Sequence, residues 1–259
     1  MDGITIGMLV LLFACWGSFL NVIAFRLVRD GSLIDPLWSY CPACHTQLAW
    51  YDLIPVFSWL MLRGRCRTCK APISYLYPFI EAATALICTA LFMQFPFSTA
   101  AVYLLFVSAL LVIVRSDIET MLICTYSTLA LIPAAFAAAF LQIIPLSLPQ
   151  SILGATTGYI TLYIINALYQ KRSGITGIGQ GDMDMMAMIG AFLGTIGWWA
   201  TLTIGSIAGS LFGISYIAYT KSARTLRIPF GPFLALGALI YLFWSESITY
   251  FLFGYFLIK

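Results

Sequence analysis

The chain has 259 residues, of which 61% are hydrophobic and 9% are charged, with a formal net charge of +3. Soluble domains have about 45–50% apolar and about 25% charged residues, so this composition excludes a soluble enzyme, a disordered chain and a nucleic-acid-binding protein. It predicts an all-α polytopic membrane protein surrounded by lipid, because a membrane span needs about 20 apolar residues.

The chain begins with a long apolar run within residues 1–27, which has basic residues at its end rather than its start. A cleaved signal peptide has its positive charge before a shorter apolar core. Residues 1–27 are therefore predicted to form a retained first span. Residues 28–74 are the only extended polar stretch and are predicted to form a separate segment before a membrane domain of residues 75–259.

Seven further apolar runs follow, so the sequence predicts about eight spans in all. They are expected near residues 75–95, 98–115, 121–144, 149–169, 184–199, 200–219 and 232–257. The two runs on either side of Gly197 are not separated by a charged residue, which makes their boundary the weakest in the sequence.

The basic residues predict the orientation of these spans. Of the 13 lysines and arginines, all except Lys259 fall in or beside the segments that an eight-span topology places on one side. Cytoplasmic loops carry an excess of Lys and Arg, so these segments are predicted to face the cytoplasm, with both termini outside. They are residues 28–74, 115–120, 170–183 and 220–231.

Small residues recur at four-residue spacing in the later spans, a pattern that is typical of close helix packing in lipid. These residues are Gly154 and Gly158, Gly190 and Gly194, and Gly205, Gly209 and Gly213.

Four cysteines in the polar segment have the spacing of a metal site. The motif Cys41-Pro-Ala-Cys44 is followed after 21 residues by Cys66-Arg-Thr-Cys69. Two such motifs turn four sulfurs toward one point, as a tetrahedral zinc ion requires, and a reducing cytoplasm disfavours disulfides. We predict a closed structural zinc site, the alternative being free or redox-active thiols. His45, next to one motif, is interpreted as a bystander.

The single histidine also limits the chemistry that the spans can contain. His45 lies in the polar segment, so a nucleophile paired with histidine inside the membrane is excluded. The sequence has neither an HExxH motif nor a P-loop. The glycines of residues 177–181 superficially resemble a dinucleotide loop, but no strand is predicted before them.

Acidic residues beside the spans are the remaining candidates, because ionisable groups at membrane depth are costly. Asp117 and Asp182 are each predicted at the cytoplasmic end of a span, and Gly179 and Gly181 leave room for a peptide beside Asp182. Two adjacent carboxyl groups, one protonated and one ionised, activate water in aspartic proteases. From the residues alone, a hydrolase with a carboxyl dyad and a transporter coupled to protons or cations both remain open.

The ordered set of motifs resembles the type IV prepilin peptidases, membrane aspartic proteases with a GxGD motif. The resemblance extends over nearly the whole chain. It rests on Gly17-Ser-Phe-Leu-Asn-Val22, the two cysteine motifs, Asp52-x-Ile54-Pro55, Tyr77-Pro78, Glu81, Asp117, Gly179-x-Gly181-Asp182 and Pro229-Phe-Gly-Pro232.

This resemblance implies an enzyme of the bacterial inner membrane that cleaves the leaders of prepilins and pseudopilins after a glycine, on the cytoplasmic face. Asp117 and Asp182 match the two catalytic aspartates of the family, and Cys41, Cys44, Cys66 and Cys69 match its zinc ligands. The resemblance also implies N-methylation of the new amino terminus, with S-adenosylmethionine as the methyl donor.

The chain departs from the family pattern at two places: Cys124-Thr125 replaces proline and an acidic residue or asparagine, and Asp184 replaces lysine or an apolar residue. If Asp182 opens a helix, Asp184 points about 200° away from it. Asp184 is then expected at the headgroup boundary or beside a basic residue such as Lys171 or Arg172.

Overall fold

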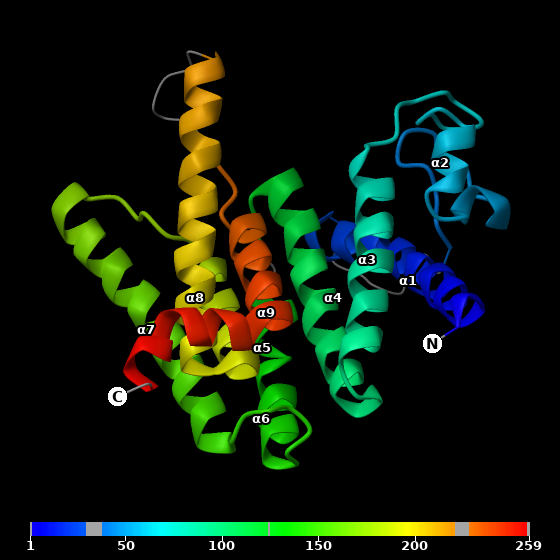
Figure 1. Ribbon diagram of the computed structural model, residues 1–259. Coiled ribbons are helices and arrows are strands. Elements are labelled where there is room, and N and C mark those ends of the chain that lie inside the picture. The colour runs from blue at the N-terminus through cyan, green and yellow to red at the C-terminus, as the bar shows by residue number, and fades with distance from the viewer. Residues whose placement is uncertain (1, 30–37, 124, 221–227, 258–259) are drawn as a thin grey trace. The chain divides into compact units, whose positions relative to one another are not determined.

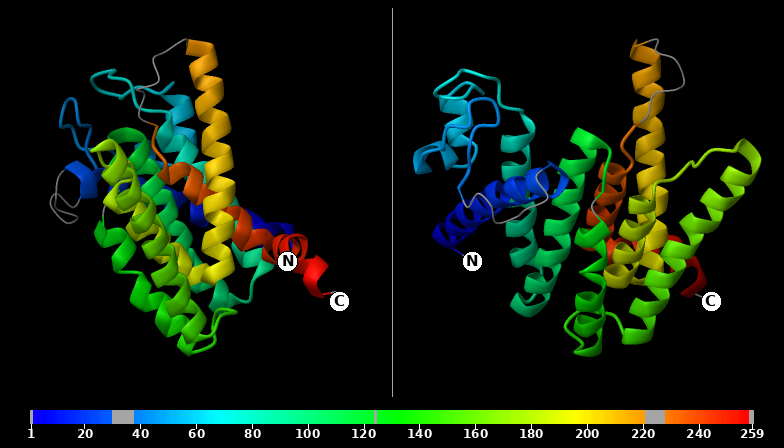
Figure 2. Two further views of the ribbon diagram at one scale, coloured as in Figure 1. Left: turned by 90° about the vertical axis from the view of Figure 1, so that its left-hand side faces the viewer. Right: turned by 180° about the vertical axis from the view of Figure 1, so that it is seen from behind.

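The computed structural model describes residues 2–29, 38–123, 125–220 and 228–257. Within these ranges the chain is helical apart from two isolated β-bridges, which confirms the predicted all-α class. Six helices of the described chain are long and apolar enough to cross a membrane. The chain forms two compact units, Met1–Ser116 and Asp117–Lys259, whose helices are shown in Figure 1 and Figure 2.

The first unit contains α1 (Gly3–Arg29), η1 (Trp50–Leu53), α2 (Phe57–Met61), α3 (Leu76–Gln94) and most of α4 (Phe97–Thr120). Helix α1 crosses α3 in close contact (Figure 1). A Cβ atom at Gly17 would lie 2.9 Å from the Cα of Glu81 and the Cβ of Thr84. The missing side chain of Gly17 therefore allows the two backbones to approach.

A polar cluster links the helices of this unit. The Asn21 amide on α1 donates to the carbonyl of Tyr77 at 3.1 Å and accepts from Arg115 Nε at 3.2 Å. The Arg115 guanidinium, which is 1% exposed, lies 4.8 Å from the centre of the Tyr77 ring. This buried cation is accommodated by the amide and the aromatic face.

The second unit begins in the last turn of α4 and continues with α5 (Thr125–Leu129), α6 (Ile132–Phe140), α7 (Leu148–Ser173), α8 (Gln180–Thr220) and α9 (Gly231–Leu257). Helix α7 begins where its sequence predicts: Ser147 and Gln150 form a capping box. It ends at Gly174, whose φ of 74° is favourable only for glycine.

Helix α8 is interrupted at Gly194, where φ is 73° and ψ is −172°. The spans predicted at 184–199 and 200–219 therefore correspond to two helical segments, and the break at Gly194 comes before the expected boundary between residues 199 and 200. The span predicted at 121–144 is represented by the short helices α5 and α6. The predicted number of about eight spans thus corresponds to six long helices and this short pair, with α8 divided at Gly194; α9 also has non-helical backbone, at Trp244.

The predicted close packing at the small residues is confirmed in this unit. A Cβ atom at Gly154 would lie 2.2 Å from the carbonyl oxygen of Gly190, and one at Gly158 would lie 2.9 Å from that of Met186. One at Gly205 would lie 2.9 Å from the carbonyl oxygen of Phe233. The glycines therefore bring α8 into backbone contact with α7 and α9.

Candidate metal centre and carboxylate site

The four cysteines of the polar segment meet at one point. The sulfurs of Cys41, Cys44, Cys66 and Cys69 all lie within 4.8 Å of one another, and those of Cys41 and Cys69 are 3.8 Å apart. In tetrahedral coordination with metal–sulfur bonds of about 2.3 Å, neighbouring sulfurs are about 3.8 Å apart. All four cysteines are free of disulfides, so this group fits a metal ion.

The two cysteine motifs repeat the same local fold. Tyr40 pairs with Gln47 around the first motif, and Arg65 pairs with Pro72 around the second, each in an antiparallel bridge. The N–H of the first cysteine accordingly donates to Thr46 in one motif and to Ala71 in the other, at 3.0 and 2.8 Å. Each motif is a small hairpin that directs both of its sulfurs to the same side.

Hydrogen bonds favour the thiolate form, which a metal requires, at Cys44 and Cys66, whereas burial and contacts with the other three cysteines raise the pKa of Cys69 to about 11. The Thr46 hydroxyl lies 3.3 Å from the sulfur of Cys44, and this contact lowers the pKa of the Cys44 thiol. Backbone hydrogen bonds from Cys69 and Thr68 lower the pKa of Cys66. His45 stacks on Tyr40 with ring centroids 5.9 Å apart and is not in the cysteine group, in agreement with its interpretation as a bystander.

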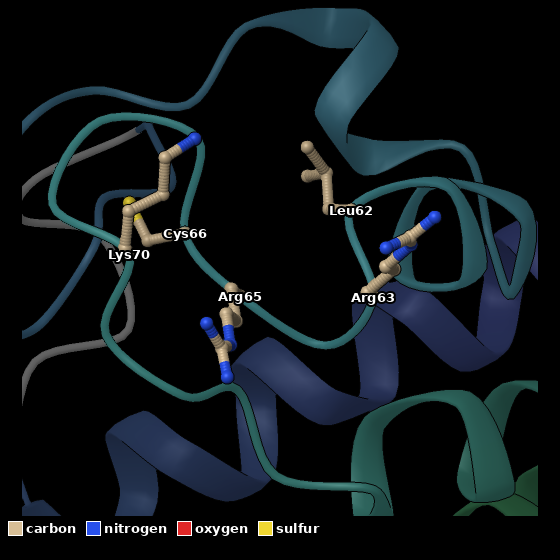
Figure 3. Close-up of a pocket in the computed structure, with 5 residues that line it drawn as sticks. All are labelled: Leu62, Arg63, Arg65, Cys66 and Lys70. Atoms are coloured by element: carbon tan, nitrogen blue, oxygen red, sulfur yellow. The ribbon is translucent and has the colours of Figure 1, made fainter.

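A cavity of about 320 Å³ lies beside the second motif and is lined by Leu62, Arg63, Arg65, Cys66 and Lys70. Figure 3 shows that its three basic side chains point in different directions. All three are exposed. Such a lining attracts anions to the surface of the segment. The charged groups of the three side chains do not converge on one point, so they do not form a binding site for a single anion.

Glu81 connects the polar segment to α3. This carboxyl group is 7% exposed, and its Oε2 accepts a hydrogen bond from the N–H of Val56 at 2.7 Å. Val56 has a φ of 62°, which is unfavourable for a β-branched residue. The hydrogen bond from Glu81 helps to hold this turn before α2.

Asp117 lies in the last turn of α4 and is 5% exposed. Its Oδ2 accepts a hydrogen bond at 2.9 Å from the N–H of Gly231, the first residue of α9. An unpaired N–H at a helix start is a natural partner for an anion. The start of α9 therefore stabilises negative charge on Asp117.

Asp182 lies in the first turn of α8 and is half-buried. A Cβ atom at Gly181 would lie 2.6 Å from the Cβ of Ile123, in the loop that follows α4. This contact brings the turn that bears Asp182 against the end of the helix that bears Asp117.

The loop before Asp182 is held in place by α7. The side-chain oxygen of Asn166 accepts hydrogen bonds from the N–H groups of Gly177 and Ile178, both at 3.0 Å. At Gly179 a Cβ atom would lie 3.2 Å from the carboxylate of Asp182. The glycine at 179 therefore keeps the space beside this carboxylate open, as the sequence predicts.

The prediction for the surroundings of Asp184 is wrong. Asp184 is 3% exposed, rather than at a headgroup boundary or beside a basic residue. Its Oδ1 accepts from the Gln180 amide at 3.0 Å, and the same amide nitrogen donates to the hydroxyl of Tyr159 at 3.1 Å. Its other oxygen is buried with no hydrogen-bond partner in the described chain.

Sequence reasoning missed the partner of Asp117 and the group around Asp184. The motif Pro229-Phe-Gly-Pro232 was a signal for the first, because a glycine and a proline at a helix start expose a free N–H. The spacing of Gln180 and Asp184, four residues apart on one helix face, was a signal for the second. The departure at Cys124 lies outside the described residues.

Two carboxyl groups at adjoining helix ends of a polytopic membrane protein are an arrangement typical of membrane-embedded hydrolases with an acid pair, and the chain also has four cysteines that could hold a metal ion. Comparison with family models identifies the family. The "Bacterial Peptidase A24 N-terminal domain" matches residues 11–95, and the "Type IV leader peptidase family" matches residues 104–214.

Curated relatives agree with both family models over most of the chain. The prepilin leader peptidase/N-methyltransferase of Aeromonas hydrophila is 34% identical over 266 residues, covering 93% of this chain and 91% of the relative. Relatives with the same name from Pseudomonas aeruginosa and Xanthomonas campestris are 31% and 30% identical, covering 93% and 90% of this chain and 90% and 89% of their own lengths.

The chain therefore belongs to the type IV leader peptidase family and is a multi-pass bacterial membrane protein. None of the solved structures matches it significantly.

Proposed function

We propose that this chain removes the leaders of type IV prepilins and pseudopilins after a glycine, on the cytoplasmic face of the inner membrane, with Asp117 and Asp182 as its catalytic pair. The relatives are named as prepilin leader peptidases and N-methyltransferases. The observation that supports the catalytic pair is the contact of the Gly181 turn, which bears Asp182, with Ile123, just after the helix end that bears the buried Asp117.

The carboxyl pair supplies both proton transfers that peptide hydrolysis requires. The ionised carboxyl group takes a proton from water, whose oxygen then attacks the scissile carbonyl carbon. The protonated carboxyl group hydrogen-bonds the carbonyl oxygen as negative charge develops there. When the C–N bond breaks, a proton passes to the leaving nitrogen, and the products are a carboxyl group and a free amine.

The second proposed activity is methylation of that amine. With S-adenosylmethionine as the methyl donor, the amine nitrogen would form the new bond to the methyl carbon, S-adenosylhomocysteine would leave, and one amine proton would be lost. This step accords with the N-methyltransferase in the relatives' names. It requires the peptidase product as its substrate, so cleavage precedes methylation.

Zinc is the metal we propose for Cys41, Cys44, Cys66 and Cys69. Four thiolates leave no coordination position for water or substrate, so this ion stabilises the fold of the polar segment rather than activating water. Residues 28–74 then form one metal-supported cytoplasmic segment between a span of residues 1–27 and a membrane domain of residues 75–259.

Mass spectrometry of a purified prepilin incubated with the purified protein tests both activities. The leader mass should be lost without S-adenosylmethionine, and one methyl increment should appear only when it is present. A prepilin of unchanged mass would refute the proposed peptidase. Cleavage without the increment would refute only the methylation step.

A further inference from the structure

Helix α2 exposes one apolar face. Phe57, Leu60 and Met61 are spaced three and four residues apart, so their side chains share one side of the helix. They are 57%, 59% and 68% exposed. Helix η1, which contacts α2, contributes Trp50, which is 78% exposed. A group of large exposed apolar side chains on a polar segment marks an interaction surface.

The opposite side of α2 is packed, so this exposure does not come from a loosely held helix. The indole Nε1 of Trp59 donates to the carbonyl of Ile73 at 3.1 Å. The Trp59 ring also covers Gly64, where a Cβ atom would lie 2.8 Å from it. Because residues two apart on a helix point about 200° from each other, Phe57 is directed away from this packed side.

Contacts with α3 place α2 beside the end of a membrane span. Val56, the residue before α2, donates its N–H to Glu81 at 2.7 Å. Glu81 lies five residues inside α3, which is long and apolar enough to cross a membrane. At 1.5 Å per residue, this contact is about 7.5 Å from the start of the span. Helix α2 is therefore close to the same end of α3 (Figure 1) and lies at the level of the membrane surface.

The charges around α2 are positive. Asp52 is the single acidic residue in the described part of the polar segment, and it is paired with Arg67, with Nη2 and Oδ1 2.7 Å apart. Arg63, Arg65 and Lys70 are exposed and supply the net positive charge. Their charged groups diverge (Figure 3), so they suit a surface with many anionic headgroups rather than one bound anion.

We propose that α2 anchors the polar segment to the membrane surface. Its apolar face lies at the boundary between headgroups and acyl chains, and Arg63, Arg65 and Lys70 contact anionic phospholipid headgroups. Interfacial helices bind through buried apolar area together with attraction to anionic lipids. Tryptophan is enriched at the same depth, which suits Trp50 on η1. This surface does not depend on the proposed peptidase reaction, and its test uses no prepilin.

Photo-crosslinking of the full chain tests the apolar contact. The crosslinking residue p-benzoylphenylalanine, placed at Phe57, keeps an aromatic ring and reacts with nearby C–H groups on illumination. The chain is reconstituted into vesicles of phosphatidylethanolamine and phosphatidylglycerol, and the adducts are identified by mass spectrometry. We expect phospholipid adducts at least about tenfold more often than from the same probe at Ala43, because burial of a phenylalanine favours an apolar phase by that factor or more. Ala43 is exposed in the first cysteine hairpin and is the control.

The lipid composition of the adducts tests the charged contacts. Phosphatidylglycerol should be enriched in the adducts about fivefold over its share of the vesicle, as expected for one basic side chain near an anionic surface. Replacing Arg63, Arg65 and Lys70 together by glutamine should abolish this enrichment. Replacing Lys171 and Arg172 by glutamine should leave it unchanged, because this exposed basic pair lies in the last turn of α7.

A second probe position, Met61, protects the test against a local effect of the substitution at Phe57. Adducts only to protein from both positions would show that another part of the chain or a second copy covers this face, and would overturn the proposal. Equal lipid adducts from positions 57 and 43, or none from positions 57 and 61, would also overturn it. Enrichment of phosphatidylglycerol that persists in the triple glutamine variant would refute the headgroup contacts.

Discussion

The group of four cysteines and the carboxylate site are organised over very different distances along the chain. Each cysteine hairpin closes within eight residues, from Tyr40 to Gln47 and from Arg65 to Pro72. The hydrogen bond between Asp117 and Gly231 instead joins residues 114 positions apart. The cysteine group therefore depends on local turns, whereas the carboxylate site depends on contacts among the last turn of α4 and the starts of α8 and α9.

This difference predicts that the two regions fail independently. Loss of a sulfur should unfold a local segment, because metal binding is coupled to folding. Loss of a carboxyl group should leave the helices in place, because the close backbone contacts at Gly154, Gly158 and Gly205 do not involve Asp117 or Asp182. Four sets of variants test whether the two regions fail independently, beginning with the strongest expected loss of activity.

Asp117→Asn and Asp182→Asn should each reduce leader cleavage by at least about 100-fold. The amide has nearly the same shape as the carboxyl group but cannot exchange the catalytic proton, and such transfers contribute about 10²–10⁴-fold. Initial rates with a purified prepilin provide the measurement. Bound metal should stay at the wild-type amount.

Glu119→Gln is the matched control for these variants, because Glu119 is exposed on the same helix turn as Asp117. It should retain most of the activity. Wild-type turnover by Asp117→Asn or Asp182→Asn would remove that residue from the mechanism.

Cys44→Ser should release most of the metal and lower methylation more than cleavage. One missing thiolate opens the four-sulfur site, whose binding energy also stabilises the polar segment. Metal analysis and the two product masses distinguish these effects. Cys15→Ser is the control, since Cys15 lies on α1 outside the cysteine group. Active wild-type protein without zinc would contradict the proposed metal.

Gly231→Pro should reduce the cleavage rate about 10- to 100-fold. Proline removes the N–H that binds Asp117, and a hydrogen bond to a charged group contributes about 1.5–3 kcal/mol. Gly231→Ala keeps the N–H and should retain much more activity. Equal rates for the alanine and proline variants would show that this hydrogen bond does not support catalysis.

The parts of the molecule that depend on local sequence could be predicted. The spacing of the cysteines predicts the hairpins, and apolar runs predict the helices. The end of α7 follows from Gly174, which adopts a left-handed conformation. The glycines at four-residue spacing predict the close contacts of α7, α8 and α9 because only a missing side chain permits them.

Features that depend on tertiary contacts could not be predicted. The motif Pro229-Phe-Gly-Pro232 indicates a free N–H at a helix start, but nothing in it identifies Asp117 as the partner, because the two residues come from different helices. The break in α8 occurs at Gly194, and several other glycines in the same helix are suitable by composition. Which of them adopts a positive φ depends on tertiary contacts; at Gly194 the neighbour is the side chain of Leu146, in the loop between α6 and α7.

The environment of Asp184 leads to the smallest predicted effect. Asp184 and Asp182 point about 200° apart on α8, so only Asp182 is directed toward Asp117. Asp184 instead accepts a hydrogen bond from Gln180, the residue between the two glycines of the GxGD motif. Its contribution to cleavage is therefore indirect, through the position of the turn that leads to Asp182.

Asp184→Asn should retain most of the cleavage activity, because the amide oxygen can still accept the hydrogen bond from Gln180. Asp184→Leu removes this acceptor and should lower kcat several-fold, since the Gly179–Asp182 turn loses its anchor. Steady-state kinetics of the two variants, measured with one prepilin, provide the comparison. If Asp184→Asn were as inactive as Asp182→Asn, the charge of Asp184 would be required rather than its hydrogen bond. Asp184 would then be one of the catalytic carboxylates.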